Sequence, residues 1–210
     1  MNTFIEVEAT PRSLSMRGLI DGVGINDAPY IINIKVDGSY VMCPYYKTWK
    51  SMLARCYSAN FQSANPSYRG CWVCDEWLYF MNFRMWMEKQ DWEGLFLDKD
   101  IIVKGNKCYS PDTCIFVTRQ VNSILIDRAA DRGGCVVGVS WSKSNGKYCA
   151  KCSVDSKQVN LGFYDSEEEA SFAYRVFKGN VVKVIAEQQE DIRLVDALME
   201  IAAGYLNETS

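Results

Sequence analysis

The spacing of apolar residues predicts two helices in the first half of the chain. From Tyr45 to Tyr57, apolar side chains recur every three or four residues, which is the pattern of a helix with one buried face. Pro44 stands at its start, where proline is favoured because the N–H it lacks would have no helical partner. From Trp77 to Met87 large apolar residues fall on most sides, so this second helix is expected to be buried on more than one face.

A small hairpin is predicted near the N-terminus. Ile31–Val36 and Ser39–Met42 both have strand character. The pair Asp37-Gly38 between them is a tight-turn sequence, because both residues tolerate positive φ. Residues 1–43 are therefore expected to form a leader that contains one hairpin.

Residues 97–122 predict a ββα unit, in which two strands precede a helix. Polar and apolar residues alternate over residues 97–101, as in a half-buried strand. The pair Gly105-Asn106 offers hairpin-turn chemistry. A second apolar run, residues 114–117, leads into a helix that Thr118 can cap.

The C-terminal part predicts a sheet packed on a helix. Residues 138–164 contain three short alternating strands separated by polar turns, and Ser166-Glu167-Glu168-Glu169 then forms a capping box at the start of a helix. A last helix, Asp191–Tyr205, has too broad an apolar surface to stand alone in solvent. We expect it to pack on its own domain, with a dimer seam as the alternative.

The composition is that of a globular protein with a packed core. The chain has 210 residues, of which 48% are hydrophobic and 23% are charged. No apolar run reaches about 18 residues, and the N-terminus lacks the basic and apolar regions of a signal peptide. Nine cysteines, an odd number, favour reduced thiols in such a chain. A soluble intracellular protein with no membrane partner is expected.

One cysteine motif invites a metal interpretation. Cys71 and Cys74 form a C-x-x-C, to which Cys108 and Cys114 would add two further ligands of a structural zinc. The set lacks a second C-x-x-C, and Trp72-Val73 is bulkier than the usual residues of a zinc knuckle. The pattern therefore disfavours structural zinc and favours buried thiols that pack as small hydrophobic groups.

The charge is unevenly distributed along the chain. A net charge of −3 argues against a strong non-specific nucleic-acid binder. Residues 41–70, however, carry four basic residues and no acidic one. Three of these lie off the apolar stripe of the predicted helix, where they can face DNA phosphates: Lys47, Lys50 and Arg55. A solvated helix face explains the same residues nearly as well.

The segments LDKDI, GN, YSPDTC and FV with a trailing Asn resemble the ββα-metal segment of phage-encoded HNH endonucleases, as do YKTWKSMLARCY and YRGCWVCDEWLYFMNF upstream. The resemblance implies a nuclease in which an aspartate and asparagines hold one divalent metal while a histidine activates water. This chain contains no histidine, so Lys99 stands in the place of the general base and Thr113 in that of a metal-side asparagine. It implies Asp98 and Asn122 as metal ligands assisted by Asp100, with Mg²⁺ or Mn²⁺ as the cofactor of an active enzyme.

Two outcomes stay open for this degenerate site, whose candidate catalytic residues are Asp98, Lys99 and Asn122. A lysine starts near pKa 10.4, and the flanking carboxylates of Asp98 and Asp100 favour its protonated form. A metal-bound hydroxide could replace the base, because a divalent ion lowers the pKa of its water. The alternative is a scaffold that binds DNA without cutting it.

Residues 138–186 resemble the APETALA/ethylene-response-factor DNA-binding domain, which also occurs appended to phage HNH proteins. The resemblance rests on GV at 138, GKY at 146, LGFY at 161 and the EEA…AY helix. In that family the sheet enters the major groove, often with arginine and tryptophan side chains. Serine, glutamine and asparagine replace them here, which predicts lower affinity or a sheet that has lost the groove. The corresponding positions are Ser140, Ser142, Lys151, Ser153, Gln158 and Asn160, with Lys143 and Lys147 near the DNA backbone.

These patterns together predict an α+β fold, with an HNH-like ββα-metal domain and flanking helices followed by a three-stranded antiparallel sheet packed on a helix. The expected function is double-stranded DNA binding by a phage protein in the cytoplasm of a bacterial host cell, with nicking if the metal site works. The alternative is a catalytically dead regulator or an inhibitor that binds a host protein; a homodimer would suit a palindromic site. The predicted division is a leader (1–43), an HNH-like domain (44–130), a linker (131–137), an APETALA-type domain (138–189) and a C-terminal helix (190–210).

Overall fold

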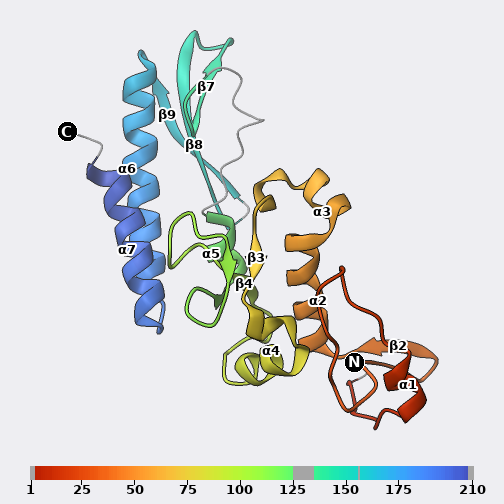
Figure 1. The fold of residues 1–210 in the computed structure, drawn as a ribbon. Coiled ribbons are helices and arrows are strands. Elements are labelled where there is room, and N and C mark those ends of the chain that lie inside the picture. The colour runs from red at the N-terminus through yellow and green to blue at the C-terminus, as the bar shows by residue number, and fades with distance from the viewer. Residues whose placement is uncertain (1–2, 125–134, 156, 208–210) are drawn as a thin grey trace. The chain divides into compact units, whose positions relative to one another are not determined.

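The computed structural model describes residues 3–124, 135–155 and 157–207 and has a mixed α+β fold (Figure 1). The chain forms two compact units, Met1–Phe116 and Val117–Ser210, each with its own hydrophobic core. The predicted α+β class and the three-stranded antiparallel sheet of the C-terminal part are confirmed. The predicted linker falls largely outside the described residues, which resume at Cys135.

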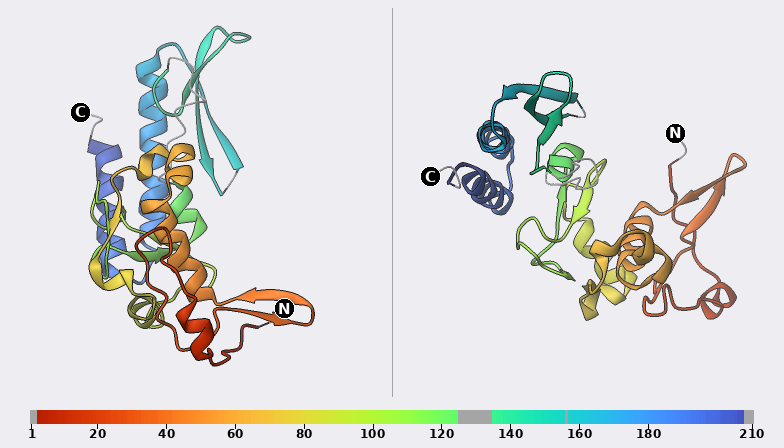
Figure 2. Two further views of the ribbon diagram at one scale, coloured as in Figure 1. Left: turned by 45° about the vertical axis from the view of Figure 1, so that its right-hand side comes forward. Right: turned by 90° about the horizontal axis from the view of Figure 1, so that it is seen from above.

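Short helices and short strands make up the first unit (Figures 1 and 2). Within it, β1 pairs with β2, β3 with β5 and β4 with β6. The elements up to the start of the second unit are α1 (Pro11–Ser15), β1 (Asn33–Val36), β2 (Ser39–Met42), α2 (Pro44–Tyr57), α3 (Ala59–Ala64), η1 (Pro66–Tyr68), β3 (Trp72–Val73), η2 (Asp75–Leu78), α4 (Phe80–Met87), β4 (Phe96–Asp98), β5 (Cys108–Tyr109) and β6 (Ile115–Val117).

The N-terminal hairpin forms as predicted. Strands β1 and β2 are antiparallel with Val36 opposite Ser39, so Asp37 and Gly38 are the two turn residues. Their φ angles are 48° and 83°. When both turn residues have positive φ, the backbone twist of a two-residue turn matches the twist of the two strands that it joins.

Aromatic side chains from α2, η2 and α4 form the core of the first unit. Trp49 and Phe80 are fully buried, and the rings of Trp77 and Phe83 meet edge to face with centroids 5.0 Å apart. The indole N–H of Trp49 donates to the carbonyl oxygen of Trp77 at 2.6 Å, which satisfies a polar group inside the core. The predicted buried face of α2 is confirmed, except that Tyr46 is buried where the prediction had Tyr45. The buried residues of α2 are Tyr46, Trp49, Met52, Leu53 and Cys56.

The helix predicted over residues 77–87 is interrupted. Asp75–Leu78 form a 3-10 turn, and Tyr79 is extended with φ −91° and ψ 124°, so α4 begins one residue later. Ile25 forms backbone hydrogen bonds on both sides of Tyr79, at 2.8 and 3.0 Å. This pairing with the leader uses backbone groups that a continuous helix would occupy. The buried residues of α4 are Phe80, Phe83 and Met87, whereas Met85 is 52% exposed.

The predicted order of strand, strand and helix is present in β4, β6 and α5 (Arg119–Ile124). The hydroxyl oxygen of Thr118 accepts the N–H of Val121 at 3.2 Å, which confirms Thr118 as the cap of α5. Two details differ from the prediction. The first strand ends at Asp98, and Gly105-Asn106 does not close a hairpin, because the chain leaves β4 as a loop and β5 pairs in parallel with β3.

The second unit is a sheet with a helix on one face, followed by a second helix that packs on the first. The sheet order is β7 (Val139–Ser142), β8 (Lys147–Val154) and β9 (Lys157–Tyr164), all antiparallel. The helices are α6 (Glu167–Ala186) and α7 (Ile192–Asn207). Ala150 of the sheet and Ala170 of α6 are fully buried, so small side chains let the helix approach the sheet closely.

The expected packing of the last helix on its own domain is confirmed by the contact between α6 and α7. Gly179 lies at this contact, where an added Cβ would come within 2.8 Å of the Leu206 side chain. The buried residues of α7 are Leu194, Ala197, Leu198 and Ala202, whereas Ile192 at its start is 67% exposed. Among the described residues no helix is long and apolar enough to cross a membrane.

Candidate nucleic-acid interface

The register of the three-stranded sheet places the predicted DNA-facing residues on one face. Ser142 is opposite Lys147, Lys151 is opposite Asn160, and Ser153 is opposite Gln158. Directly opposed residues point to the same side of a sheet, and alternate residues along a strand share a side. Ser140 therefore lies on this side as well. We call this surface the polar face: Ser140, Ser142, Lys147, Cys149, Lys151, Ser153, Gln158, Asn160 and Phe163.

The opposite face of the same sheet is apolar and packs on α6. Val139 is opposite Ala150, and both belong to the buried core with Cys152 and Tyr174. A strand that is apolar on one side and polar on the other fixes which side meets solvent, because a slip by one residue would expose the core. The polar face is therefore held outward by the packing of the other side.

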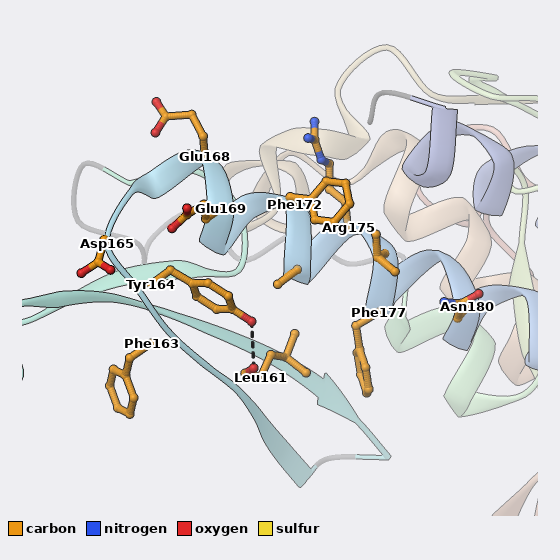
Figure 3. Close-up of a pocket in the computed structure, with 12 residues that line it drawn as sticks. Leu161, Phe163, Tyr164, Asp165, Glu168, Glu169, Phe172, Arg175, Phe177 and Asn180 are labelled. Atoms are coloured by element: carbon orange, nitrogen blue, oxygen red, sulfur yellow. Dashed lines mark hydrogen bonds between the residues drawn. The ribbon is translucent and has the colours of Figure 1, made fainter. Parts of the chain in front are cut away.

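Phe163 is a member of the polar face that sequence reasoning missed. It is opposite Cys149, it is 44% exposed, and it extends from the side of β9 away from α6 (Figure 3). Alternation along β9 gave no signal for it, because a period of two from Gln158 and Asn160 leads to Gly162 and Tyr164. A β-bulge between Ala150 and Lys151 shifts the register, and this shift puts Phe163 on the polar face.

Hydrogen bonds already restrict some of the polar side chains. The Asn160 Oδ1 accepts the Gly162 N–H at 3.1 Å and the Cys149 thiol at 3.5 Å, so its amide NH₂ is the group left to donate to a ligand. The paired contact to adenine that an asparagine can make needs both groups, so Gln158 is the better candidate for it. Lys147 forms an exposed ion pair with Asp165 at 3.0 Å.

Lys143 lies in the exposed turn between β7 and β8. Asn145 and Gly146 both donate backbone N–H groups to the Ser142 carbonyl oxygen, at 3.2 and 2.9 Å, which closes this turn. Gly146 has a φ of 60°, a value that glycine adopts at little cost. The turn holds Lys143 at the end of the sheet, where a DNA backbone contact was expected.

On α2 the structure separates the three predicted basic contacts. Lys47 and Lys50 are exposed. The Arg55 guanidinium instead donates to the Leu97 carbonyl oxygen at 3.2 Å and to the Tyr109 hydroxyl at 3.4 Å. Arg55 therefore joins α2 to β4 and β5 as a structural residue, and we remove it from the predicted DNA contacts.

The loop after β4 contains the predicted catalytic residues Asp98 and Lys99. Asp98 Oδ1 accepts the backbone N–H groups of Asp100 and Ile101 at 3.0 and 2.9 Å. Burial raises the pKa of Asp98, and the nearby Asp100 carboxylate raises it further. The carboxylate thus ends the strand by capping the turn that follows it.

Lys99 is buried, with 5% of its surface exposed, and is held as a cation. Its ammonium donates to the Asp100 carboxylate and to the Asn106 carbonyl oxygen, both at 3.0 Å. Burial alone would lower its pKa, but the hydrogen bond and attraction from Asp100 raise the pKa of Lys99. A protonated amine has no lone pair to accept a proton, so these contacts support a structural role rather than that of a general base.

Asn106 organises the rest of this loop. Its amide donates to the carbonyl oxygens of Lys99 and Cys108, both at 2.6 Å, and its Oδ1 accepts the Cys108 N–H at 3.1 Å. Thr113, in the place of a metal-side asparagine, donates to the same Cys108 carbonyl at 2.8 Å. The sequence signal for Asn106 was the Gly-Asn pair, which we had interpreted as a hairpin turn.

The residues implied as metal ligands lie in different units, with Asp98 and Asp100 in the first and Asn122 on α5 in the second. Over residues 3–124, 135–155 and 157–207, no cluster of three or more Cys, Asp or Glu side chains could hold a metal. In the first unit the Lys99 ammonium already neutralises Asp100. The donors of the first unit alone do not fit a divalent ion, and we derive no chemical step through one.

The cysteines of the C-x-x-C and its neighbours are free thiols. Burial raises the pKa of Cys74 and Cys108, and it raises the pKa of Cys114 to about 12. Zinc is bound by the thiolate, which a raised pKa disfavours. Cys71 and Cys114 are buried in the hydrophobic core of the first unit, and Cys74 packs against it.

No known protein family, curated protein or solved structure matches this chain. The function therefore has to be argued from the geometry of its own residues.

Proposed function

We propose that this chain is a phage protein that binds double-stranded DNA through the polar face of the β7–β8–β9 sheet. The observation that carries the proposal is the composition of that sheet. Strands β7, β8 and β9 contain three lysines and no acidic residue, although the whole chain has a net charge of −3. The major groove of DNA is about 12 Å wide and admits two neighbouring β-strands.

The residues of the polar face divide into two expected roles. Lys147 and Lys151, together with Lys143 in the turn, supply positive charge for phosphates, which gives affinity without sequence information. Gln158 can make paired hydrogen bonds to adenine, and the exposed ring of Phe163 can contact a thymine methyl group. The absence of arginine on this face predicts modest affinity and a modest specificity.

The proposal is tested by fluorescence anisotropy with a labelled duplex of about 30 base pairs, at salt concentrations from about 50 to 200 mM. We expect binding that weakens steeply with salt, and a slope smaller by about two in the Lys147→Gln, Lys151→Gln double variant. Lys183→Gln is the matched control, because this exposed lysine of α6 lies outside the polar face. Equal affinity and slope in all three proteins would remove the sheet from the DNA interface.

The same measurement separates this proposal from the host-protein alternative. An apolar protein interface responds little to salt, whereas phosphate contacts release counterions and respond strongly. DNA as the ligand also agrees with a location in the cytoplasm of the bacterial host. The HNH-like part then acts as a scaffold that binds without cutting, since Lys99 is cationic and the chain has no histidine.

A further inference from the structure

A groove runs along the second unit between β9 and α6, and Phe163 of the polar face is among the residues that line it. It has a volume of about 1010 Å³. Figure 3 shows Leu161, Tyr164 and Phe177 between the strand and the helix. The groove follows α6 from Glu168 to Asn180, a length of about 18 Å at 1.5 Å per residue.

The groove contains an exposed aromatic residue that the hydrophobic core does not use. Phe172, in the second turn of α6, is 48% exposed. The core of the unit uses Ala170 and Tyr174 on the other side of the helix and does not need Phe172. Clustered exposed apolar side chains with polar groups at their border are typical of protein-binding surfaces.

The border of the groove is acidic. Asp165, Glu168 and Glu169 line it; Asp165 forms the ion pair with Lys147 at 3.0 Å, and Arg175 contributes one positive charge. Acidic residues at the first turn of a helix are stabilised by its dipole, which accounts for two of them without a ligand. The dipole does not account for Phe172 one turn further along. Glu168 and Glu169 lie at one end of the groove next to the aromatic side chains of Phe172 and Phe177. Such a surface complements a segment that carries basic residues beside apolar ones.

The edge of β9 is poorly suited to receive another strand. The register shifts between Ala150 and Lys151, and the Tyr164 hydroxyl donates to the Leu161 carbonyl oxygen at 2.9 Å (Figure 3). A bulge and an occupied carbonyl both oppose strand addition at a sheet edge. Recognition in this groove must therefore come from side chains, as when a helix lies in a groove.

We propose that the groove binds a basic amphipathic helix of a partner protein, about three turns long. Its apolar side chains contact Phe172 and Phe177, and its lysines or arginines gather at the end that lies near Glu168 and Glu169. The groove residues that this inference uses, Glu168, Glu169, Phe172 and Phe177, are all on α6 and outside the polar face, so the inference stands without the proposed DNA binding.

The probe is a fluorescein-labelled helical peptide of about 14 residues, with leucines at i, i+3 and i+7 and arginines at one end. A peptide of the same composition in scrambled order is the control. We expect saturable binding to the full-length protein, measured by anisotropy, and an affinity at least about tenfold lower in both Phe172→Ser and the Glu168→Lys, Glu169→Lys double variant. The Glu187→Lys variant, which changes the C-cap residue of α6 beyond the groove, should bind as the wild type does.

Three outcomes would overturn the proposal. They are no saturable binding of the probe to the wild type, equal binding of the scrambled peptide, and equal affinity in the groove variants and in Glu187→Lys. Circular dichroism shows whether each variant is folded, which is expected because Phe172 and both glutamates are exposed. The duplex assay on the same proteins keeps a failure of DNA binding separate from a failure of this site.

Discussion

The carboxylate of Asp98 has two opposing effects on stability. It caps two backbone N–H groups of the loop, a favourable contribution of about 1 kcal/mol for each net hydrogen bond. Its charge is unfavourable, because burial and the neighbouring Asp100 raise its pKa above the ordinary 3.8. An asparagine retains the accepting oxygen and removes the charge, whereas an alanine removes both.

We therefore expect Asp98→Asn to be at least as stable as the wild type near pH 7, and Asp98→Ala to be less stable by about 1–3 kcal/mol. Since the pKa is raised in the folded state, the folded protein binds this proton more tightly than the unfolded chain. Loss of this proton therefore lowers the free energy of unfolding as the pH rises from the unfolded-state pKa of Asp98 through its folded-state pKa. Thermal unfolding should show the gap between Asp98→Asn and the wild type narrowing from about pH 7 to pH 4. A gap that widens on acidification would contradict the raised pKa.

Lys99 should be a stabilising cation rather than a reactive amine. We expect Lys99→Met to lower the free energy of unfolding by about 1–3 kcal/mol, because it leaves the Asn106 carbonyl and the Asp100 carboxylate without this donor. The exposed Lys104 is the control, and Lys104→Met should change stability by less than about 0.5 kcal/mol.

The pH dependence distinguishes the two residues. The pKa of Lys99 is raised from 10.5, so its contribution is complete below that value and is lost only as the pH rises through the folded-state pKa. The difference between Lys99→Met and the wild type, followed by urea unfolding, should be constant between about pH 6 and pH 9. A difference that disappears within that interval would show that the amine loses its proton near neutrality.

At the scale of elements, the junction before β7 depends on one glycine. Gly138 has a φ of 78°, and a Cβ placed on it would overlap the ring of Tyr174 on α6. Glycine meets both requirements at once, a left-handed backbone and a close approach of the helix. Gly146, in the turn between β7 and β8, has a φ of 60° but open space around it.

These two glycines form a matched pair for substitution. Gly138→Ala should destabilise the protein by about 2–4 kcal/mol, from backbone strain plus overpacking against Tyr174. Gly146→Ala carries the backbone cost alone, about 1–2 kcal/mol. Chemical denaturation monitored by circular dichroism gives both values. Equal losses in the two variants would show that the contact with Tyr174 does not limit this junction.

At the scale of the whole molecule, net charge is a poor guide to the surface that a ligand meets. The chain is acidic overall, yet strands β7 to β9 carry no acidic residue and residues 41–70 carry none either. Fields near a surface depend on the local arrangement of charges because salt screens distant ones within about 10 Å. An acidic groove and a basic sheet face can therefore serve different partners on one unit.

The nuclease hypothesis is decided by supercoiled plasmid incubated with Mg²⁺ or Mn²⁺. We expect retarded migration without nicking, because a cationic Lys99 cannot take a proton from water and no histidine replaces it. The Asp98→Ala, Asn122→Ala double variant should retard the plasmid to the same extent. Nicking by the wild type that this variant loses would establish a histidine-free HNH nuclease with its metal at those residues.

The second unit was largely predictable because its signals are local. Alternation with a period of two sets which side of β7 and β8 faces the core, and Gly146 and Ser166 mark a turn and a helix start within a few residues of their partners. Most residues of the polar face were implied by the resemblance to the APETALA-type domain, and the strand register places them on one side of the sheet. Phe163 was the exception, since the bulge that reorients it is set by pairing with β8.

The sequence alone thus determined the α+β class, the hairpin and the amphipathic face of α2, since each depends on neighbours in the chain. Only the tertiary structure decided the rest. The break at Tyr79 requires Ile25, and the role of Arg55 requires the carbonyl of Leu97. The burial of Lys99 requires the fold of its loop around Asn106. These partners are seven to 54 residues apart in the chain, and a buried polar group takes whichever partner the fold brings within hydrogen-bond distance.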